Sequence, residues 1–485
     1  NIFASNRYKM VFNSFNFLLF LPIVFALYWI LAKSSSKSQN ILLLVSSYFF
    51  YACWDYRFLF LLMFSTFLDY FTGIKMHEAT SQKGKKFWFW LSVGINLGFL
   101  GIFKYYNFFI GSFQELLEGF GFQANFWTIS VILPVGISFY TFHGLSYVID
   151  IYNDKIKPEK NIVDYSVFVS FFPLLVAGPI ERATHLLPQI QRERHFDYTK
   201  AVDGLRQILW GLFMKVVVAD NCATVVNHVF KDQESLNAGS LFVGAVFFAF
   251  QIYGDFSGYS NIALGTARLF GVELLRNFNY PYFSRDIAEF WRRWHISLSS
   301  WFKDYLYIPL GGSKGGMWMQ VRNTIIIFVV SGFWHGANWT FIIWGALNAL
   351  YILPLVVFKL NRNNTNIVAE NSFLPSIKEV IQIIITFILT TIAWVFFRAE
   401  TVTEAWVYVV KMFNFKAYGF PQVDLKPFIY IFILLFVEWI QRKKKHGLEL
   451  SNVRHAYIRW IIYLLVFILI LFFGASSDSF IYFQF

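Results

Sequence analysis

The sequence has little charge and almost no cysteine. Charged residues make up 14% of its 485 positions, whereas about 25% is usual for a soluble globular domain. Cys53 and Cys222 are the only cysteines, and both lie in or beside apolar stretches, which argues against a disulfide framework and against a cysteine metal site. The longest polar stretch, about residues 181–204, is too short to be an appended soluble domain. These shortages predict one transmembrane domain over residues 1–485 and no bound metal.

Familiar catalytic signatures are also missing. We find no serine nucleophile elbow, no Walker loop, no His-Glu-x-x-His pair and no cysteine-rich cluster. A single base that acts on an acceptor hydroxyl, with an activated acyl donor, needs none of these motifs. Acyl transfer therefore stays open, and no bound cofactor is expected.

Apolar residues dominate what is present: 57% of the chain is hydrophobic and 21% is aromatic. The net charge of +12 is explained without nucleic acid, because Lys and Arg favour cytoplasmic loops and anionic lipid. We therefore expect a lipid bilayer as partner and no nucleic acid.

The apolar runs predict an all-α integral membrane protein with about twelve crossings, in a range of 11–13. The run 323–358 is too long for one crossing, and we divide it after Trp339. The run Val163–Ile180 leads into basic residues and contains two prolines, so we expect it to enter the membrane and return. With that correction the basic loops fall in the cytoplasm and both termini outside. Residues 1–9 are expected to be an N-terminal extension before a natural start at Met10.

Residues 285–305 are dense in charge and tryptophan. Read as one helix, they place Phe290, Trp291, Trp294 and Leu298 on an apolar face and the charged residues on the other, typical of an interfacial amphipathic helix. His295 lies at the border of the apolar face. A histidine anchored in an aromatic belt is the simpler interpretation, but the arginines also suit an anionic donor group.

His335 stands in a stretch without charge between Arg322 and Lys359. An ionisable group at membrane depth is costly, and its default interpretation is functional. A neutral core histidine bonded to a backbone carbonyl is the alternative. With an unperturbed pKa of about 6.5, a histidine can act as a general base near neutral pH.

Three further features give weaker signals. His143 ends the polar-aromatic run Ser138–His143. Gly254-Asp-Phe-Ser-Gly258 is expected to break a helix, with Asp255 as a helix cap. Leu310–Gly316 is rich in glycine and is expected to form a flexible cytoplasmic loop that touches donor phosphates.

Seven segments together resemble the membrane-bound O-acyltransferase family, and within it the branch of alginate O-acetyltransferase membrane subunits. A lone Trp-His-Gly would be weak, but the combination is specific. The segments are Leu133–Phe142, Phe172–Ile180, Gly254–Ser260, Phe290–Ser299, Trp301–Gly312, Trp334–Gly336 and Phe480–Phe485.

The resemblance implies re-entrant and interfacial helices around a central tunnel, with residues 285–345 as the active-site core. It implies acetyl-CoA as cytoplasmic donor, an extracytoplasmic polysaccharide as acceptor, a periplasmic SGNH-type acetyltransferase as partner and a bacterial inner-membrane location. His335 becomes the expected catalytic residue and His295 the second. The candidate donor- or substrate-binding residues are Trp291, Arg292, Arg293, Ser299, Asp304, Tyr305, Trp334 and Asn338.

Other functions stay open at this point. D-alanyl transfer to teichoic acid and lipid O-acylation are variants of the same chemistry. A proton-coupled transporter with His335 and His143 as a relay is the alternative outside enzymes, although we see no clear repeats or paired acids in the sequence.

Overall fold

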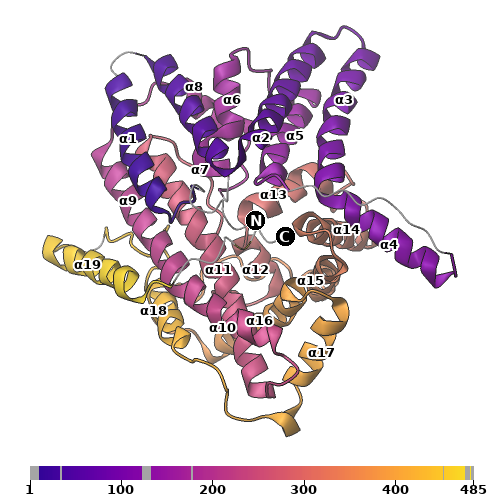
Figure 1. Cartoon of the computed structure of the whole chain (residues 1–485), viewed down its shortest axis with the longest axis vertical. Coiled ribbons are helices and arrows are strands. Elements are labelled where there is room, and N and C mark those ends of the chain that lie inside the picture. Colours follow the sequence, from indigo (N-terminus) through magenta and orange to yellow (C-terminus); the bar gives the residue numbers. More distant parts are fainter. Residues whose placement is uncertain are drawn as a thin grey trace. The chain divides into compact units, whose positions relative to one another are not determined.

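The computed structural model describes residues 10–32, 35–122, 133–175, 178–451, 453–475 and 481 (Figure 1). The expected extension 1–9 lies outside these ranges, as does the terminal motif Phe480–Phe485 apart from Ile481. All regular structure in the described ranges is helical, which confirms the predicted all-α class.

The chain divides into two compact units, residues 1–201 with 266–275 and residues 202–265 with 276–485. Helices α9 and α11 contribute residues to both. The first eight helices are α1 (Phe15–Leu31), α2 (Ser36–Glu78), α3 (Gln82–Leu100), α4 (Tyr106–Gly119), α5 (Ile137–Tyr152), α6 (Ile162–Ser170), α7 (Phe172–Leu175) and α8 (Ala183–Gln191). The others are α9 (Tyr198–Leu212), α10 (Asp220–Lys231), α11 (Ala238–Leu269), α12 (Ile287–Arg293), α13 (Ile296–Phe302), α14 (Met317–His335), α15 (Trp339–Val357), α16 (Ile377–Arg398), α17 (Val402–Met412), α18 (Pro427–Ile440) and α19 (Ala456–Phe473).

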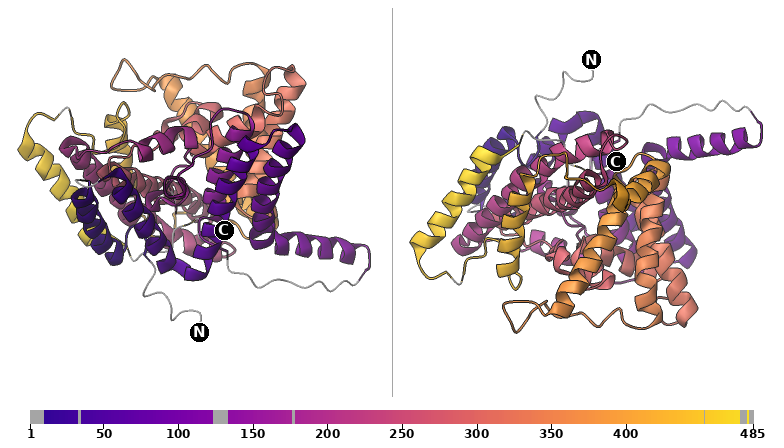
Figure 2. Two further views of the ribbon diagram at one scale, coloured as in Figure 1. Left: turned by 90° about the horizontal axis from the view of Figure 1, so that it is seen from above. Right: turned by 90° about the horizontal axis from the view of Figure 1, so that it is seen from below.

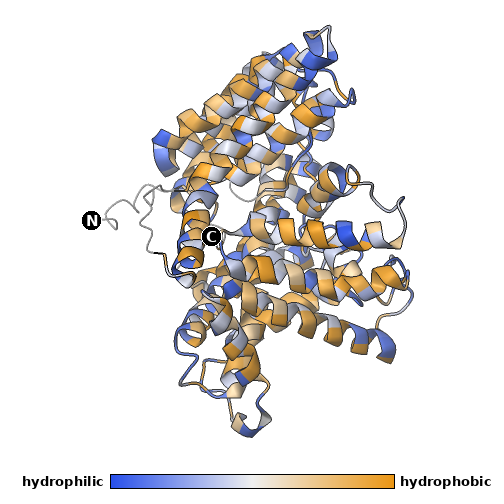
Figure 3. Cartoon of the chain, turned by 90° about the vertical axis from the view of Figure 1, so that its right-hand side faces the viewer, coloured by the Kyte–Doolittle hydropathy of each residue, from blue (hydrophilic) through white to orange (hydrophobic). Residues whose placement is uncertain are grey.

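Several of these helices suit a membrane. Hydrophobic residues predominate along the helices, and hydrophilic residues are more frequent in loops and at helix ends (Figure 3). Among the described residues, seven helices are long and apolar enough to cross a bilayer, and three shorter apolar helices accompany them. The range of 11–13 crossings stays a prediction. The seven are Ser36–Glu78, Gln82–Gly119, Tyr198–Lys231, Ala238–Leu269, Trp339–Val357, Ile377–Arg398 and Ala456–Phe473.

In the first unit, α2 packs against α3, α5 and α6. The apolar runs 40–53 and 57–74 both lie in α2, which bends at Asp55 (φ −159°, ψ 112°) without an intervening loop. Helix α4 extends away from this bundle, and none of its residues is buried (Figure 2). The expected re-entrant run is interrupted: α6 ends at Ser170, and α7 is a single turn from Phe172. Its return to the same membrane side stays a prediction.

In the second unit, α11 corrects one expectation. It is continuous, so the helix break at Gly254–Gly258 was wrong. A Cβ on Gly254 would lie 2.8 Å from the Met214 carbonyl oxygen, so this glycine lets α11 approach the neighbouring chain closely. Asp255 is in the middle of the helix and does not cap it. Its carboxylate lies 2.8 Å from Lys215 Nζ, in a buried ion pair that the sequence did not reveal.

Helices α14, α15 and α16 are neighbours in the second unit (Figure 1). The run 323–358 is divided as predicted, although the break at residues 336–338 comes before Trp339 and not after it. The turn between α14 and α15 brings two helix ends and the end of α16 together around His335.

Candidate active site

His335 is the last residue of α14 and is 5% exposed. The chain then becomes extended at Gly336, and Asn338 caps α15 by accepting a 3.0 Å hydrogen bond from Thr340 N. Close packing holds this hairpin shut: a Cβ on Gly332 would lie 2.2 Å from the Phe341 carbonyl oxygen. The turn therefore fixes where the His335 imidazole sits.

Aromatic rings surround this imidazole. The ring centroids of Trp334, Trp344 and Phe397 lie 4.9, 5.1 and 5.4 Å from that of His335. They come from α14, α15 and α16. Such a shell excludes bulk water, and electrostatic interactions within it are stronger than in water.

His295 corrects the prediction of one helix over 285–305. Two short helices, α12 and α13, replace it, and His295 stands between them in the left-handed region (φ 43°, ψ 53°). A residue with a side chain there costs about 1–2 kcal/mol, so the surroundings must hold it. Asn277 does so in part, because its carbonyl oxygen accepts a 2.9 Å bond from Ile296 N.

Asn277 also fixes the proton on the His295 ring. Its Oδ1 lies 3.0 Å from His295 Nδ1 and accepts a 2.9 Å bond from Ser297 Oγ, while its Nδ2 donates to Ser260 Oγ at 3.1 Å. Because Oδ1 can only accept, Nδ1 carries the hydrogen and Nε2 presents a lone pair.

The Nε2 lone pair of His295 is free to accept a hydrogen bond from a ligand, as far as the described residues show. His295 is 1% exposed, and within the described ranges its Nε2 has no hydrogen-bond partner. His295 lies outside the seven candidate crossings, and burial lowers its pKa to about 3. The imidazole is therefore neutral near pH 7 and can accept a hydrogen bond from a hydroxyl.

The two predicted histidines lie together. Their ring centroids are 6.4 Å apart at an interplanar angle of 59°, and the Trp334 ring lies 6.3 Å from His295. The sequence placed both in an active-site core but could not give this separation. It is suited to two groups that contact one small reacting centre.

Trp291 packs against Trp344, one of the aromatic residues around His335. Its ring lies 5.3 Å from that of Phe328 and 5.7 Å from that of Trp344, which itself contacts His335. Trp394, which the sequence did not single out, stacks on Trp344 at 5.5 Å.

The arginines of the expected charged face are engaged within the protein. Arg293 is buried and donates to Glu289 at 2.8 Å, and Glu289 is paired with Arg285 as well. Arg292 donates to the carbonyl oxygens of Asn361 and Asn364 at 2.8 and 2.7 Å. The prediction of one charged face opposite the apolar face was wrong for the buried members, because they form an internal ion-pair cluster.

The remaining predicted residues lie on or near this core. Ser299 Oγ is 3.4 Å from the Trp294 carbonyl oxygen, and Tyr305 packs on Trp301 at 5.0 Å. Asp304 lies in the π-helical segment Lys303–Tyr307. Asn338 donates to the Glu400 carbonyl oxygen at 2.9 Å in addition to capping α15.

The glycine-rich loop Leu310–Gly316 is tied to the start of α14. Asn323 Nδ2 donates to the Gly312 carbonyl oxygen at 3.0 Å, and Arg322 donates to that of Leu310 at 3.0 Å. These bonds oppose the expected flexibility of the loop.

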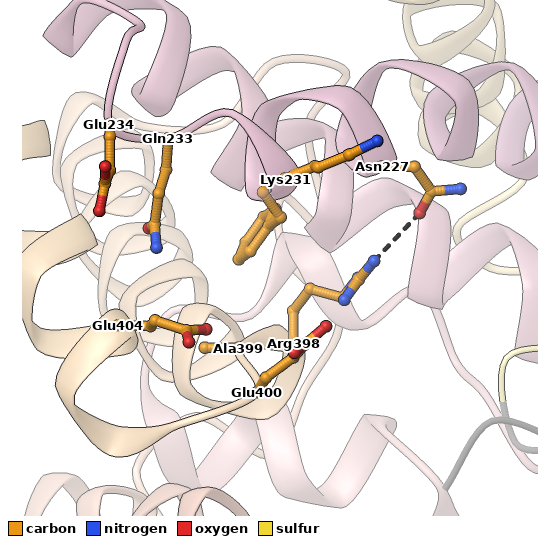
Figure 4. Close-up of a pocket in the computed structure, with 9 residues that line it drawn as sticks. Asn227, Lys231, Gln233, Glu234, Arg398, Ala399, Glu400 and Glu404 are labelled. Carbon is orange, nitrogen blue, oxygen red and sulfur yellow. Dashed lines mark hydrogen bonds between the residues drawn. The ribbon is translucent and has the colours of Figure 1, made fainter.

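A cavity of about 530 Å³ begins where α16 ends. Phe397 contacts His335, and the next residue, Arg398, lines the cavity and donates to Asn227 Oδ1 at 3.1 Å (Figure 4). Polar side chains predominate around it. The other lining residues are Phe230, Lys231, Gln233, Glu234, Ala399, Glu400 and Glu404.

Metal ligands do not gather in the described part of the chain: no group of three or more His, Cys, Asp or Glu side chains there is arranged to hold an ion.

Residues 154–399 match the model of the membrane-bound O-acyltransferase family, and this range includes both histidines. The chain belongs to this family. The resemblance noted in the sequence is thereby confirmed, and the chain is a multi-pass bacterial membrane protein with O-acyltransferase activity.

Comparison with individual relatives indicates the branch of the family to which the chain is similar. The chain is 38% identical over 417 residues to the "Probable alginate O-acetylase AlgI" of Pseudomonas aeruginosa, covering 86% of this chain and 77% of that protein. It is 35% identical over 427 residues to the peptidoglycan O-acetyltransferase of Helicobacter pylori, covering 82% and 79%. The teichoic acid D-alanyltransferase of Bacillus subtilis is 28% identical over 236 residues, covering 46% and 58%. The chain is a membrane O-acetyltransferase by this relationship.

Proposed function

We propose that the chain moves acetyl groups from cytoplasmic acetyl-CoA to an extracytoplasmic polysaccharide, through a periplasmic partner acetyltransferase of the SGNH type. The observation that carries this proposal is the pairing of His335 with His295, both buried among aromatic side chains. We take residues 1–485 as one functional domain and 285–345 as its active-site core.

His335 is the proposed general base. It takes the proton of an acceptor hydroxyl while the hydroxyl oxygen attacks the carbonyl carbon of the acetyl thioester. The new C–O bond forms, the C–S bond breaks, and the proton held by His335 passes to the departing thiolate. Acetyl is thus transferred with no net change in the enzyme.

His295 is proposed to orient that hydroxyl. With Nδ1–H bonded to Asn277, the Nε2 lone pair can accept a hydrogen bond but cannot donate one to the thioester carbonyl. Positioning of the acceptor therefore fits this tautomer better than polarisation of the donor.

The direction of transfer rests on the distribution of Lys and Arg. That distribution puts the two ends of 268–316 and residues 441–455 in the cytoplasm and the connections 232–237 and 399–401 outside, and His295 is buried between these sides, next to His335. The cavity lined by Arg398 is built from the outer connections, and we propose that the acceptor approaches His335 through it. Amide and carboxylate groups there suit hydroxyl-bearing ligands.

Alginate and peptidoglycan are the acceptors named for the relatives, and either is a polysaccharide that fits this proposal. D-alanyl transfer to teichoic acid is the nearest alternative, but the relatives with that name match about half of the chain, 46%.

The test is release of CoA thiol from acetyl-CoA by the purified protein in lipid vesicles, with the periplasmic partner supplied. We expect His335→Gln to lower the rate by at least about a hundredfold and His295→Gln by about tenfold or more, from the usual size of base and positioning effects. His228→Gln is the matched control, because His228 is exposed and pairs with Asp232 in the same unit. Unchanged release with His335→Gln would overturn the assignment. A preference for a D-alanyl carrier thioester or for palmitoyl-CoA would identify a different acyl donor.

A further inference from the structure

The first unit contains a cavity of about 620 Å³ that the proposed reaction does not use. It is formed by the end of α1, the segment that joins α8 to α9, and the end of α11. Its charge is unbalanced: four cationic side chains face two carboxylates. The cations are Arg192, Arg194, Lys200 and Arg268, and the carboxylates are Glu193 and Asp197.

One carboxylate of this set already has an internal role. Asp197 accepts a 3.1 Å bond from Lys200 N at the start of α9. Arg268 is paired with Glu273 at 3.3 Å. Arg192 and the Lys200 ammonium are exposed, and in the described ranges no carboxylate pairs with either head group. The cavity therefore offers two solvated cations to an anionic ligand.

Arg194 supplies an independent indication of a ligand. It is 5% exposed, donates to the Ile190 carbonyl oxygen at 2.9 Å and to Asn40 Oδ1, and lies over the Tyr28 ring. Arg194 lines this cavity, and its buried Nε has no hydrogen-bond acceptor among the described residues. A buried charged donor without an acceptor is costly, so an oxygen of a bound anion would stabilise it.

The position of the cavity indicates the source of that anion. Helix α1 is an apolar helix of 17 residues, and its exposed face carries Ile23 and Ile30. Trp29 at the end of that helix lines the cavity and packs on Phe196 at 5.3 Å. Aromatic rings beside basic residues at the end of an apolar helix are typical of the headgroup level of a bilayer.

We propose that this cavity binds the phosphate of an anionic phospholipid headgroup. Arg192 and Lys200 contact its charge, and Arg194 Nε donates to one phosphate oxygen. A soluble phosphate ester offers the same chemistry, but the apolar face of α1 beside the cavity favours a ligand with acyl chains.

Native mass spectrometry of the whole protein, released from detergent after titration with phosphatidylglycerol, tests the proposal. We expect a retained phosphatidylglycerol molecule, little retained phosphatidylcholine, and at least about tenfold weaker retention in the Arg192→Gln/Lys200→Gln double variant. Lys83→Gln/Lys86→Gln is the matched control, because those lysines are exposed near the start of α3 in the same unit. The neutral amides keep the side chains polar, and size-exclusion profiles check folding.

The arms of the experiment separate the outcomes. Equal retention of both lipids, or equal loss in the control double variant, overturns a specific headgroup site. Retention of inorganic pyrophosphate without any retained lipid assigns the cavity to a soluble phosphate ester and overturns the lipid assignment. Because lipid retention is measured without acyl transfer, failure here leaves the proposed reaction standing.

Discussion

Asn277 is expected to control the protonation of His295, and two substitutions separate that role from simple structural support. Oδ1 of Asn277 accepts bonds from His295 Nδ1 at 3.0 Å and from Ser297 Oγ at 2.9 Å. Asn277→Leu removes the Oδ1 acceptor from both buried donors, at about 1–3 kcal/mol each, so we expect about 2–6 kcal/mol of destabilisation. It also removes the hydrogen bond that keeps the proton of His295 on Nδ1. Loss of such positioning lowers the rate of acyl transfer by about 10–100-fold.

Asn277→Asp keeps an acceptor of the same size but adds a negative charge beside the ring. An opposite charge favours the protonated imidazole, so the pKa of His295 rises from its low value of about 3. Nε2 of His295 is therefore protonated at a higher pH in this variant than in the wild type.

The assay is thiol release from acetyl-CoA as a function of pH, for wild type and both variants. We expect the acid limb of kcat to move to higher pH in Asn277→Asp, while Asn277→Leu loses rate at every pH. An Asn277→Asp enzyme whose acid limb coincides with that of the wild type would refute control of His295 through this bond.

Three further outcomes concern stability. Lys215→Met should lower the free energy of unfolding by about 3–5 kcal/mol, because it leaves two buried carboxylates without their cation, and thermal unfolding in detergent measures this. Gly332→Ala should disrupt the α14–α15 turn and abolish thiol release, whereas Gly94→Ala, which has open space around it, should be neutral in the same assay. Glu181 raises the pKa of His185 above 6.5, so the stability from this pair is full below that pH and is lost as the pH rises through the raised value. Melting temperatures from pH 5.5 to 8.5 should therefore show a slope that His185→Gln removes.

Composition and motif spacing predicted the helical membrane class, the family and the division of 323–358. These features depend on local hydrophobicity and on residue types at short spacing, which sequence shows directly. They also identified His335 and His295 as the candidate catalytic residues.

Long-range contacts were not predictable in this way. The periodicity of 285–305 fits one helix, but Asn277, eighteen positions before His295, holds a left-handed turn there and divides it. Gly254 and Gly258 suggest a break by local propensity, yet in α11 they permit close helix packing. In both places tertiary packing decided the backbone, and no signal within the segment itself revealed it.

The central claim is that His335 and His295 act on one reacting group, and a double-mutant cycle in thiol release tests it most directly. If both contact the same hydroxyl, His295→Gln should cost little once His335 is already Gln, so the double variant should be about as slow as His335→Gln alone. If the fold-losses in rate of the two single variants multiply in the double variant, measured on folded protein in the same vesicles, the histidines act independently. That result would contradict the account.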